Sequence, residues 1–158
     1  MTVKLTFLAD QVDAIPIIAQ WYLDEWGYLI PDETLDRARV RLQDYLNRDR
    51  IPFVLVAIRD DEVIGCAQLK FREMGKLFPD KEHWIGGVYV ASRHRGDGVG
   101  SLLAETICSR APDYGVQTVH LQTKRLDGGL YARLGWLPVQ QVENHGLQVL
   151  VMERHLRP

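Results

Sequence analysis

Two hydrophobic periods alternate along the chain, and they separate the expected helices from the expected strands. Between residues 11 and 29, apolar side chains such as Ile15 and Ile18 recur at helical spacing, and a second helical pattern covers residues 33–48. Asp32 stands directly before that second pattern and is the expected N-cap of its helix.

From residue 53 onward the pattern changes to the short apolar runs that are typical of strands. The polar residues 59–62 separate two such runs, which predicts a β-hairpin, and residues 72–82 form a polar connection. Over the whole chain, strands are expected at 3–8, 53–58, 63–71, 84–90, 116–123, 137–142 and 147–153, and further helices at 99–110 and 129–134.

This order of elements predicts an α/β fold, with a mixed central β-sheet of about seven strands flanked by about four helices. The strand–helix–strand unit over residues 84–123 is expected to be parallel and right-handed. The length of 158 residues fits one domain, so residues 1–158 are expected to form a single domain.

Composition narrows the class of protein. With 46% hydrophobic and 25% charged residues, a globular chain is expected, and the formal net charge of −2 argues against a broad basic face for nucleic acid. No apolar run reaches the ~20 residues of a membrane helix, and no signal peptide is visible. Cys66 and Cys108 lie in apolar stretches without metal-type spacing, which predicts buried free thiols, no metal and a cytoplasmic location.

The most informative segment is a glycine-rich turn between a strand and a helix. Gly96, Gly98 and Gly100 alternate there, so the backbone can bend tightly and approach a ligand. The N–H groups that open the following helix have no partners within the helix, and they attract an anion such as a phosphate. Arg95 adds a positive charge, and Asp97 is expected to point to solvent. The alternative is a glycine-rich loop without a ligand.

The run from Arg95 to Gly100 resembles the Arg/Gln-x-x-Gly-x-Gly/Ala signature of the GNAT superfamily of acetyl-CoA-dependent N-acetyltransferases. The resemblance implies a GNAT-like fold and acetyl-CoA as cosubstrate. It also implies that the backbone of the turn holds the CoA pyrophosphate and that the preceding strand pairs with the pantetheine arm. The cofactor-binding residues implied in this way are Val88, Tyr89, Val90, Arg95, Gly96, Asp97, Gly98, Val99, Gly100 and Ser101.

The segment from Tyr131 to Trp136 resembles the Tyr-x-x-x-Gly-Phe motif of the same family. A phenol can donate a proton to a departing thiolate, and in many members this tyrosine protonates the CoA sulfur. Tyr131 is therefore the expected catalytic residue, with a buried packing tyrosine as the alternative. Where many members carry an asparagine, this chain has Lys124, either an exposed lysine or a contact to a CoA phosphate.

The sequence defines the general base and the site for the amine acceptor less clearly than the cofactor site. The strand from Trp84 to Val90 carries no carboxylate, Glu82 and His83 before it read as exposed, and His120 reads as a core histidine. In the family the first two helices wall the acceptor site, which implies Trp26 and Tyr28 as substrate-binding residues, since aromatic faces suit a cationic amine. For Trp26, whose spacing from Trp21 is nearly helical, a packing role in the core is the alternative.

The resemblance implies transfer of acetyl from acetyl-CoA to a primary amine, on a small molecule or a peptide N-terminus, by direct attack in a ternary complex. A backbone N–H near Val90 is expected to stabilise the oxyanion. Neither nucleic acid nor a membrane is an expected partner, and the tryptophans and the C-terminal hairpin leave a homodimer open. The alternatives are a CoA-binding sensor or interaction domain without turnover, and a transferase for a longer acyl-CoA.

Overall fold

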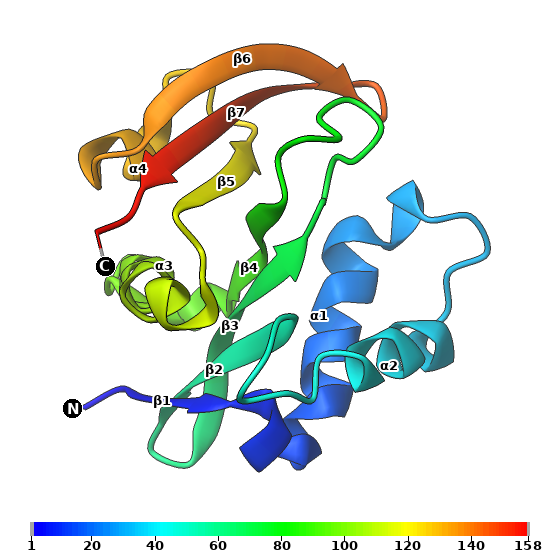
Figure 1. Cartoon of the computed structure of the whole chain (residues 1–158). Coiled ribbons are helices and arrows are strands. Elements are labelled where there is room, and N and C mark those ends of the chain that lie inside the picture. The colour runs from blue at the N-terminus through cyan, green and yellow to red at the C-terminus, as the bar shows by residue number, and fades with distance from the viewer. Residues whose placement is uncertain (1, 158) are drawn as a thin grey trace.

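The computed structural model describes residues 2–157, whose strands form one seven-stranded sheet in the order β1-β2-β3-β4-β5-β7-β6 (Figure 1). The strands are β1 (Lys4–Phe7), β2 (Phe53–Arg59), β3 (Glu62–Phe71), β4 (His83–Val90), β5 (Thr118–Thr123), β6 (Leu137–Asn144) and β7 (Leu147–His155). The α-helices are α1 (Ile15–Trp26), α2 (Leu35–Gln43), α3 (Val99–Arg110) and α4 (Gly129–Arg133). The predicted mixed sheet with flanking helices is therefore confirmed.

The second helix begins later than the sequence predicts, and its N-cap is a different residue. Thr34 has extended backbone angles, φ −135° and ψ 164°, and its hydroxyl accepts a hydrogen bond from the N–H of Arg37 at 3.1 Å. That geometry satisfies one of the helix's unpaired donors. Asp32 has φ 59°, in the left-handed region, so the expectation that it caps α2 is wrong.

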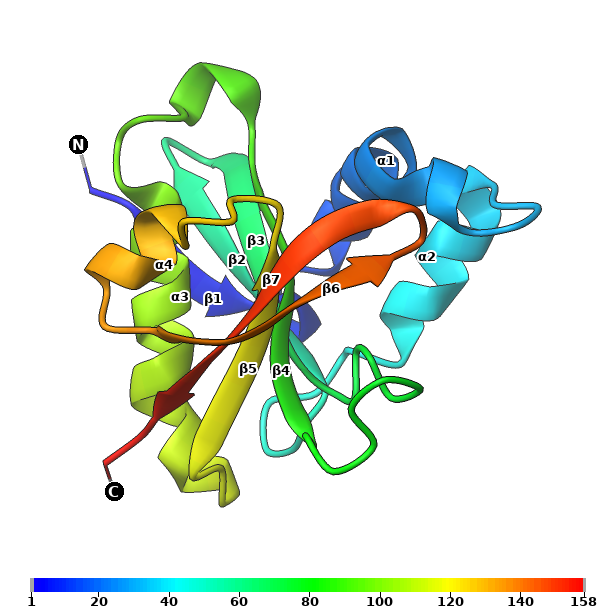
Figure 2. The same ribbon diagram turned by 90° about the horizontal axis from the view of Figure 1, so that it is seen from above.

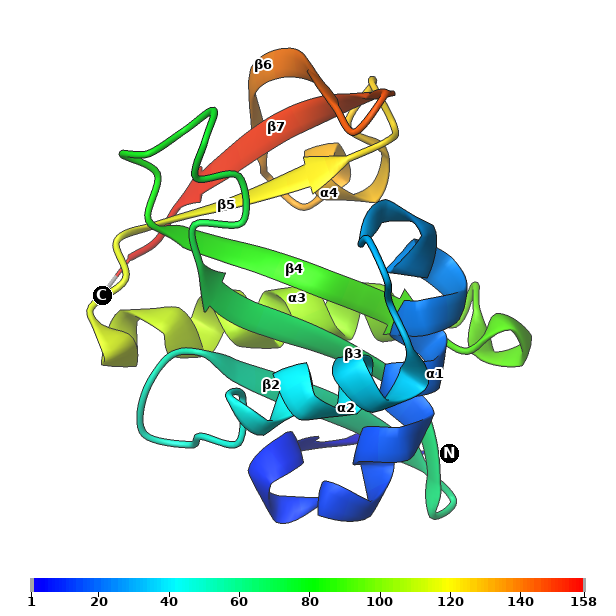
Figure 3. The same cartoon turned by 90° about the vertical axis from the view of Figure 1, so that its right-hand side faces the viewer.

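The two parallel strands at the centre of the sheet, β4 and β5, pair with each other at only one position. β4 and β5 share a single register position, Trp84 opposite His120, whereas β3 and β4 pair along most of their length, as do β5 and β7. Beyond this point the two strands diverge (Figure 3). The edge of β4 from Ile85 to Val90 therefore faces β5 without a strand partner.

Helices cover both faces of the sheet (Figure 2). On one face α1 and α2 bury Ile18 and Leu42 against β2 and β3, and on the other α3 buries Leu103 and Ile107. Burying one such side chain contributes about 1.5–3 kcal/mol, so each helix is held firmly against the sheet that carries the site. No helix among residues 2–157 combines the length and hydrophobicity that crossing a bilayer requires.

The connection between β3 and β4 is more apolar in its packing than its sequence suggests. Met74 and Phe78 are buried with Trp84, Val149 and Val151, in a third cluster between the connection and β7. The prediction of a polar connection is thus only partly right, because two apolar residues of the connection, Met74 and Phe78, are buried. This cluster holds the connection beside the place where β4 and β5 separate.

Candidate functional site

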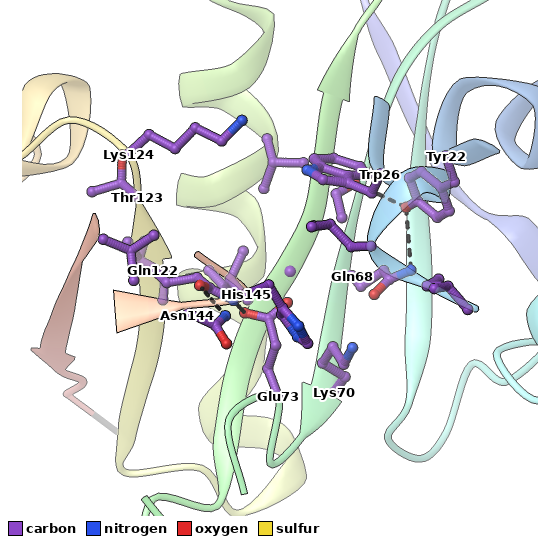
Figure 4. Close-up of a pocket in the computed structure, with 18 of the residues that line it drawn as sticks. Tyr22, Trp26, Gln68, Lys70, Glu73, Gln122, Thr123, Lys124, Asn144 and His145 are labelled. Carbon is purple, nitrogen blue, oxygen red and sulfur yellow. Dashed lines mark hydrogen bonds between the residues drawn. The ribbon is translucent and has the colours of Figure 1, made fainter. Parts of the chain in front are cut away.

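A cavity of about 560 Å³ lies where β4 and β5 diverge, between α1 and α2 on one side and the β6–β7 hairpin on the other (Figure 4). Its lining comes from helices, strands and connections far apart in the sequence. The polar and aromatic residues that the figure labels are Tyr22, Trp26, Gln68, Lys70, Glu73, Gln122, Thr123, Lys124, Asn144 and His145.

Tyr131, the expected catalytic residue, lines this cavity from α4. Its ring lies edge-on to Trp136, with 6.0 Å between the ring centroids, and Gly135 ends the short helix with φ 89°. Burial raises the pKa of the Tyr131 phenol above its ordinary value, and the negative charge of Glu73 raises it further. The phenol therefore stays protonated at neutral pH, the form that can donate a proton.

The glycine-rich turn has the shape of an anion site. Gly96 and Gly98 have φ 87° and 81°, and apart from the glycine and its two chain neighbours no atom lies within 4 Å of the place where a Cβ would stand on either one. Gly98 is the N-cap of α3, and within residues 2–157 no backbone N–H from Gly96 to Ser101 donates to a protein acceptor. These donors, with the positive end of the helix dipole, fit a diphosphate such as that of CoA.

The charged side chains of the turn, Arg95 and Asp97, contact other residues of the chain. The Nε of Arg95 donates to the carbonyl oxygen of Val90 at 2.8 Å, and its guanidinium lies 5.2 Å from the centroid of the Tyr89 ring. Asp97 is 54% exposed, as expected, and it also pairs with Arg59 at 3.3 Å. Arg95 thus links the turn to the end of β4, and the pairing with Arg59 on β2 offsets the charge of Asp97.

Strand β4 carries a bulge beside the cavity. The register shifts between Cys66 and Gln68 of β3, opposite Gly87, which has φ 54°. The carbonyl oxygen of Gly87 accepts a hydrogen bond from the Tyr22 hydroxyl at 2.8 Å, and Gln68 donates to that hydroxyl at 3.2 Å. Because an extra residue raises local twist, the bulge bends β4 at the cavity.

The two expected substrate-binding aromatics differ in position. Trp26 lines the cavity and packs against Tyr22, with 5.5 Å between the ring centroids. Tyr28 is 67% exposed and is not part of the cavity wall. At the end of β4, Tyr89 stacks on Trp21 at 4.9 Å, which joins the cofactor strand to α1.

The other polar residues singled out from the sequence lie as follows. Glu82 is half exposed, and His120 is buried with its Nδ1 3.4 Å from the carbonyl oxygen of His83 and its Nε2 3.5 Å from Glu153, as expected for a core histidine. Burial lowers the His120 pKa. Lys124 is exposed and lines the cavity.

Sequence reasoning missed a row of polar side chains across the cavity. Asn144 donates to Gln122 at 3.0 Å, and Gln122 donates to the carboxylate of Glu73 at 3.1 Å. These residues belong to β6, β5 and the β3–β4 connection, so no spacing in the sequence unites them. The apolar Met74 and Phe78 around Glu73 were the available signal that this segment is buried.

Comparison with known proteins agrees with this geometry. The family model described as "Acetyltransferase (GNAT) family" matches residues 15–136, which is most of the chain. No curated protein sequence matches.

Among solved structures, an N-acetyltransferase from Staphylococcus aureus Mu50 matches with a TM-score of 0.76 and 16% identity, over 99% of this chain and 100% of that one. An aminoglycoside 6'-N-acetyltransferase complexed with coenzyme A gives 0.73 and 14%, over 100% and 98%. A ribosomal-protein-alanine N-acetyltransferase from Brucella melitensis gives 0.71 and 23%, over 99% and 100%. These likenesses show a shared fold, and the match to the family model shows that the chain belongs to the GNAT family of acetyltransferases.

Proposed function

We propose that this chain transfers the acetyl group of acetyl-CoA to a primary amine, on a small molecule or a peptide N-terminus. The observation that carries the proposal is the position of Tyr131, whose protonated phenol lines the cavity formed where β4 leaves β5. The names of two structural neighbours, an aminoglycoside N-acetyltransferase and a ribosomal-protein-alanine N-acetyltransferase, are those of enzymes that acetylate amines.

The cosubstrate would bind along β4. The free N–H groups from Gly96 to Ser101 would hold its pyrophosphate, and the unpaired edge over Val88, Tyr89 and Val90 would pair with the pantetheine arm as an added strand does. This arrangement directs the thioester from the turn toward the cavity. Because Gly98 has no side chain, the backbone can approach the phosphates closely.

The reaction would proceed by direct attack. The amine lone pair forms a C–N bond to the thioester carbonyl, the C–S bond breaks, and Tyr131 donates its proton to the departing sulfur. A backbone N–H near Val90 would stabilise the oxyanion, an interaction worth about 2.7–4 kcal/mol in such sites. Burial raises the pKa of Cys66 to about 12, so this thiol stays protonated and is a poor nucleophile for an acetyl-enzyme.

The test is release of free CoA thiol from acetyl-CoA in the presence of a panel of amines. The panel contains aminoglycosides, polyamines and peptides with free N-termini, and mass spectrometry identifies the acetylated product. We expect thiol release with at least one class of amine. Tight CoA binding without turnover on any amine would instead identify a sensor domain, and faster turnover with a longer acyl-CoA would change the assigned donor.

A further inference from the structure

Strand β4 has a glycine where it lines the cavity, and a carboxylate from another segment fills the space. A Cβ added to Gly86 would lie 2.6 Å from Oε1 of Glu73 and 3.1 Å from Cδ of Lys70. The Glu73 carboxylate therefore lies directly over the backbone of β4, although no residue from Trp84 to Val90 is acidic. A side chain at position 86 would displace it.

The segment that carries Glu73 is fixed on both sides. Met74, the next residue, is 5% exposed and packs in the apolar cluster with Phe78. The N–H of Arg72 donates to the carbonyl oxygen of Glu82 at 2.8 Å, which closes the connection at its base. Because its neighbours in sequence are anchored, Glu73 is held in place as a side chain on a strand would be.

One carboxylate oxygen is bound and the other is open. Oε2 accepts from Gln122, which in turn accepts from Asn144, so the amides are aligned toward the carboxylate. Within residues 2–157, Oε1 has no hydrogen-bond donor, and Glu73 forms no ion pair within 4 Å, although the charge of Lys70 acts on its carboxylate. The cavity's other acid, Glu33, is paired with Arg41. Glu73 is thus the carboxylate in this wall that is available to a cation.

We propose that Glu73, whose carboxylate lies over Gly86 of β4, binds the acceptor ammonium at Oε1 and accepts its proton. The assignment rests on the proposed acetyl transfer to an amine. Glu73 takes one proton from the ammonium, and the freed lone pair forms the C–N bond. Tyr131 then protonates the departing sulfur. The second proton on nitrogen leaves as the amide forms and restores the phenol through solvent, and Glu73 releases its own proton to solvent.

This position has a defined consequence for pH dependence. Burial raises the pKa of the Glu73 carboxyl, and the Lys70 ammonium and the hydrogen bond from Gln122 oppose that rise. The other titratable groups around the cavity are Tyr22, Glu33, Arg41, Tyr45, Lys124, Tyr131 and His145. Since the base works only when deprotonated, kcat/KM falls on the acid side through the raised pKa of Glu73.

The raised pKa of Glu73 also predicts how folding stability depends on pH, and the direction is opposite to that of kcat/KM. A carboxyl whose folded pKa is raised binds its proton more tightly in the folded state, so folding stability falls as pH rises through that pKa. Glu73→Gln removes a buried charge and keeps the shape of the side chain. The variant is expected to melt at a higher temperature than wild type at neutral pH, with the gain lost in acid. A purely structural carboxylate would give lower stability instead.

The experiment measures wild type, Glu73→Gln and Glu82→Gln with the best amine of the panel. Glu82 lies on the same connection, its side chain is half exposed, and it is not part of the cavity wall. We expect Glu73→Gln to lower kcat/KM by roughly 10²–10⁴-fold and to lose the acid limb of the pH profile, with CoA affinity retained. Glu82→Gln should match wild type. A Glu73→Gln enzyme with wild-type kcat/KM and the same acid limb would overturn the assignment.

Gly86→Ala supplies a second variant that keeps the carboxylate and moves it. The three atoms nearest to its Cβ belong to the side chains of Glu73 and Lys70 and not to the backbone, so the fold is expected to persist, as retained CoA binding will show. The change should lower kcat/KM in wild type and have no further effect in the Glu73→Gln background. Equal losses in both backgrounds would contradict the proposed contact. A wild-type enzyme that acetylates no amine would refute the proposed function itself, a result distinct from an active Glu73→Gln variant.

Discussion

The glycine-rich turn and the cavity beside Tyr131 are built in opposite ways. The turn occupies seven consecutive residues from Arg95 to Ser101, and the groups proposed to bind an anion are its backbone N–H groups. The cavity is lined by residues from α1, α2, β3, β4, β5, α4, β6 and β7 and from the connections between them. The turn, where we propose that the cosubstrate binds, is therefore a local structure, whereas the cavity exists only once distant parts of the chain have folded together.

The difference teaches which parts of the molecule are free to vary. A backbone site needs glycines at fixed spacing, whereas a side chain that extends to solvent, such as that of Asp97, need not contact the ligand. A cavity assembled from distant elements changes whenever any one of its walls changes. Under the proposed function, the donor would be selected by a short motif and the acceptor by cavity side chains such as Trp26, Glu73 and His145.

The largest expected effect is on Tyr131, which lines the cavity. Tyr131→Phe removes the proton donor and keeps the ring, so kcat should fall by roughly 10²–10⁴-fold with CoA affinity unchanged. Stopped-flow or steady-state thiol release measures kcat, and calorimetry measures CoA binding. An unaltered kcat, with chemistry shown to be rate-limiting, would exclude Tyr131 as the acid.

The next effect separates the turn from ordinary glycine strain. Gly98→Val should weaken CoA binding tenfold or more, about 1.4 kcal/mol, because the side chain blocks phosphate approach. Gly115 is a matched control, since it has φ 82° and ψ 12° beside the 81° and 11° of Gly98 and equally open surroundings. Gly115→Val carries the same backbone strain and should leave the CoA Kd unchanged in calorimetry. Equal weakening in both variants would assign the effect to strain.

A smaller effect is expected in the acceptor wall. Trp26→Ala should raise KM for the amine roughly two- to thirtyfold, because an aromatic face near a cation contributes about 0.5–2 kcal/mol. The CoA Kd should not change. Tyr28→Ala is the control, since Tyr28 is exposed outside the cavity wall, and its KM should equal that of wild type. A KM shift in Tyr28→Ala alone would reverse the two roles.

The smallest effect concerns stability at the start of α2. Thr34→Ala removes the capping hydroxyl and should cost about 1 kcal/mol, a fall in Tm of roughly 2–4 °C. Thr34→Ser should restore the loss. Asp32→Gly should cost nothing, because glycine suits the φ of 59° and Asp32 makes no side-chain cap. A larger loss from Asp32→Gly than from Thr34→Ala would reinstate Asp32 as the cap.

The sequence predicts the fold and the turn well because both depend on local patterns. Hydrophobic period fixed the order of strands and helices, and Gly96 and Gly98 have the positive φ that the tight turn requires. Glu73 was not predicted as a site residue because it is recognised only by its contacts with Gly86 and Gln122. These contacts form only when β4 and β5 are in place. Asp32 was misassigned because Asp and Thr are both good caps, and only the backbone angles distinguish them.

The central claim is that the backbone from Gly96 to Ser101 grips a diphosphate and so aims the thioester along β4 into the cavity. The most direct measurement is a crystal structure of the protein with CoA. The account predicts phosphate oxygens within hydrogen-bond distance of these N–H groups and the CoA sulfur beside the Tyr131 hydroxyl. A diphosphate bound elsewhere, or a sulfur that does not approach Tyr131, would contradict it.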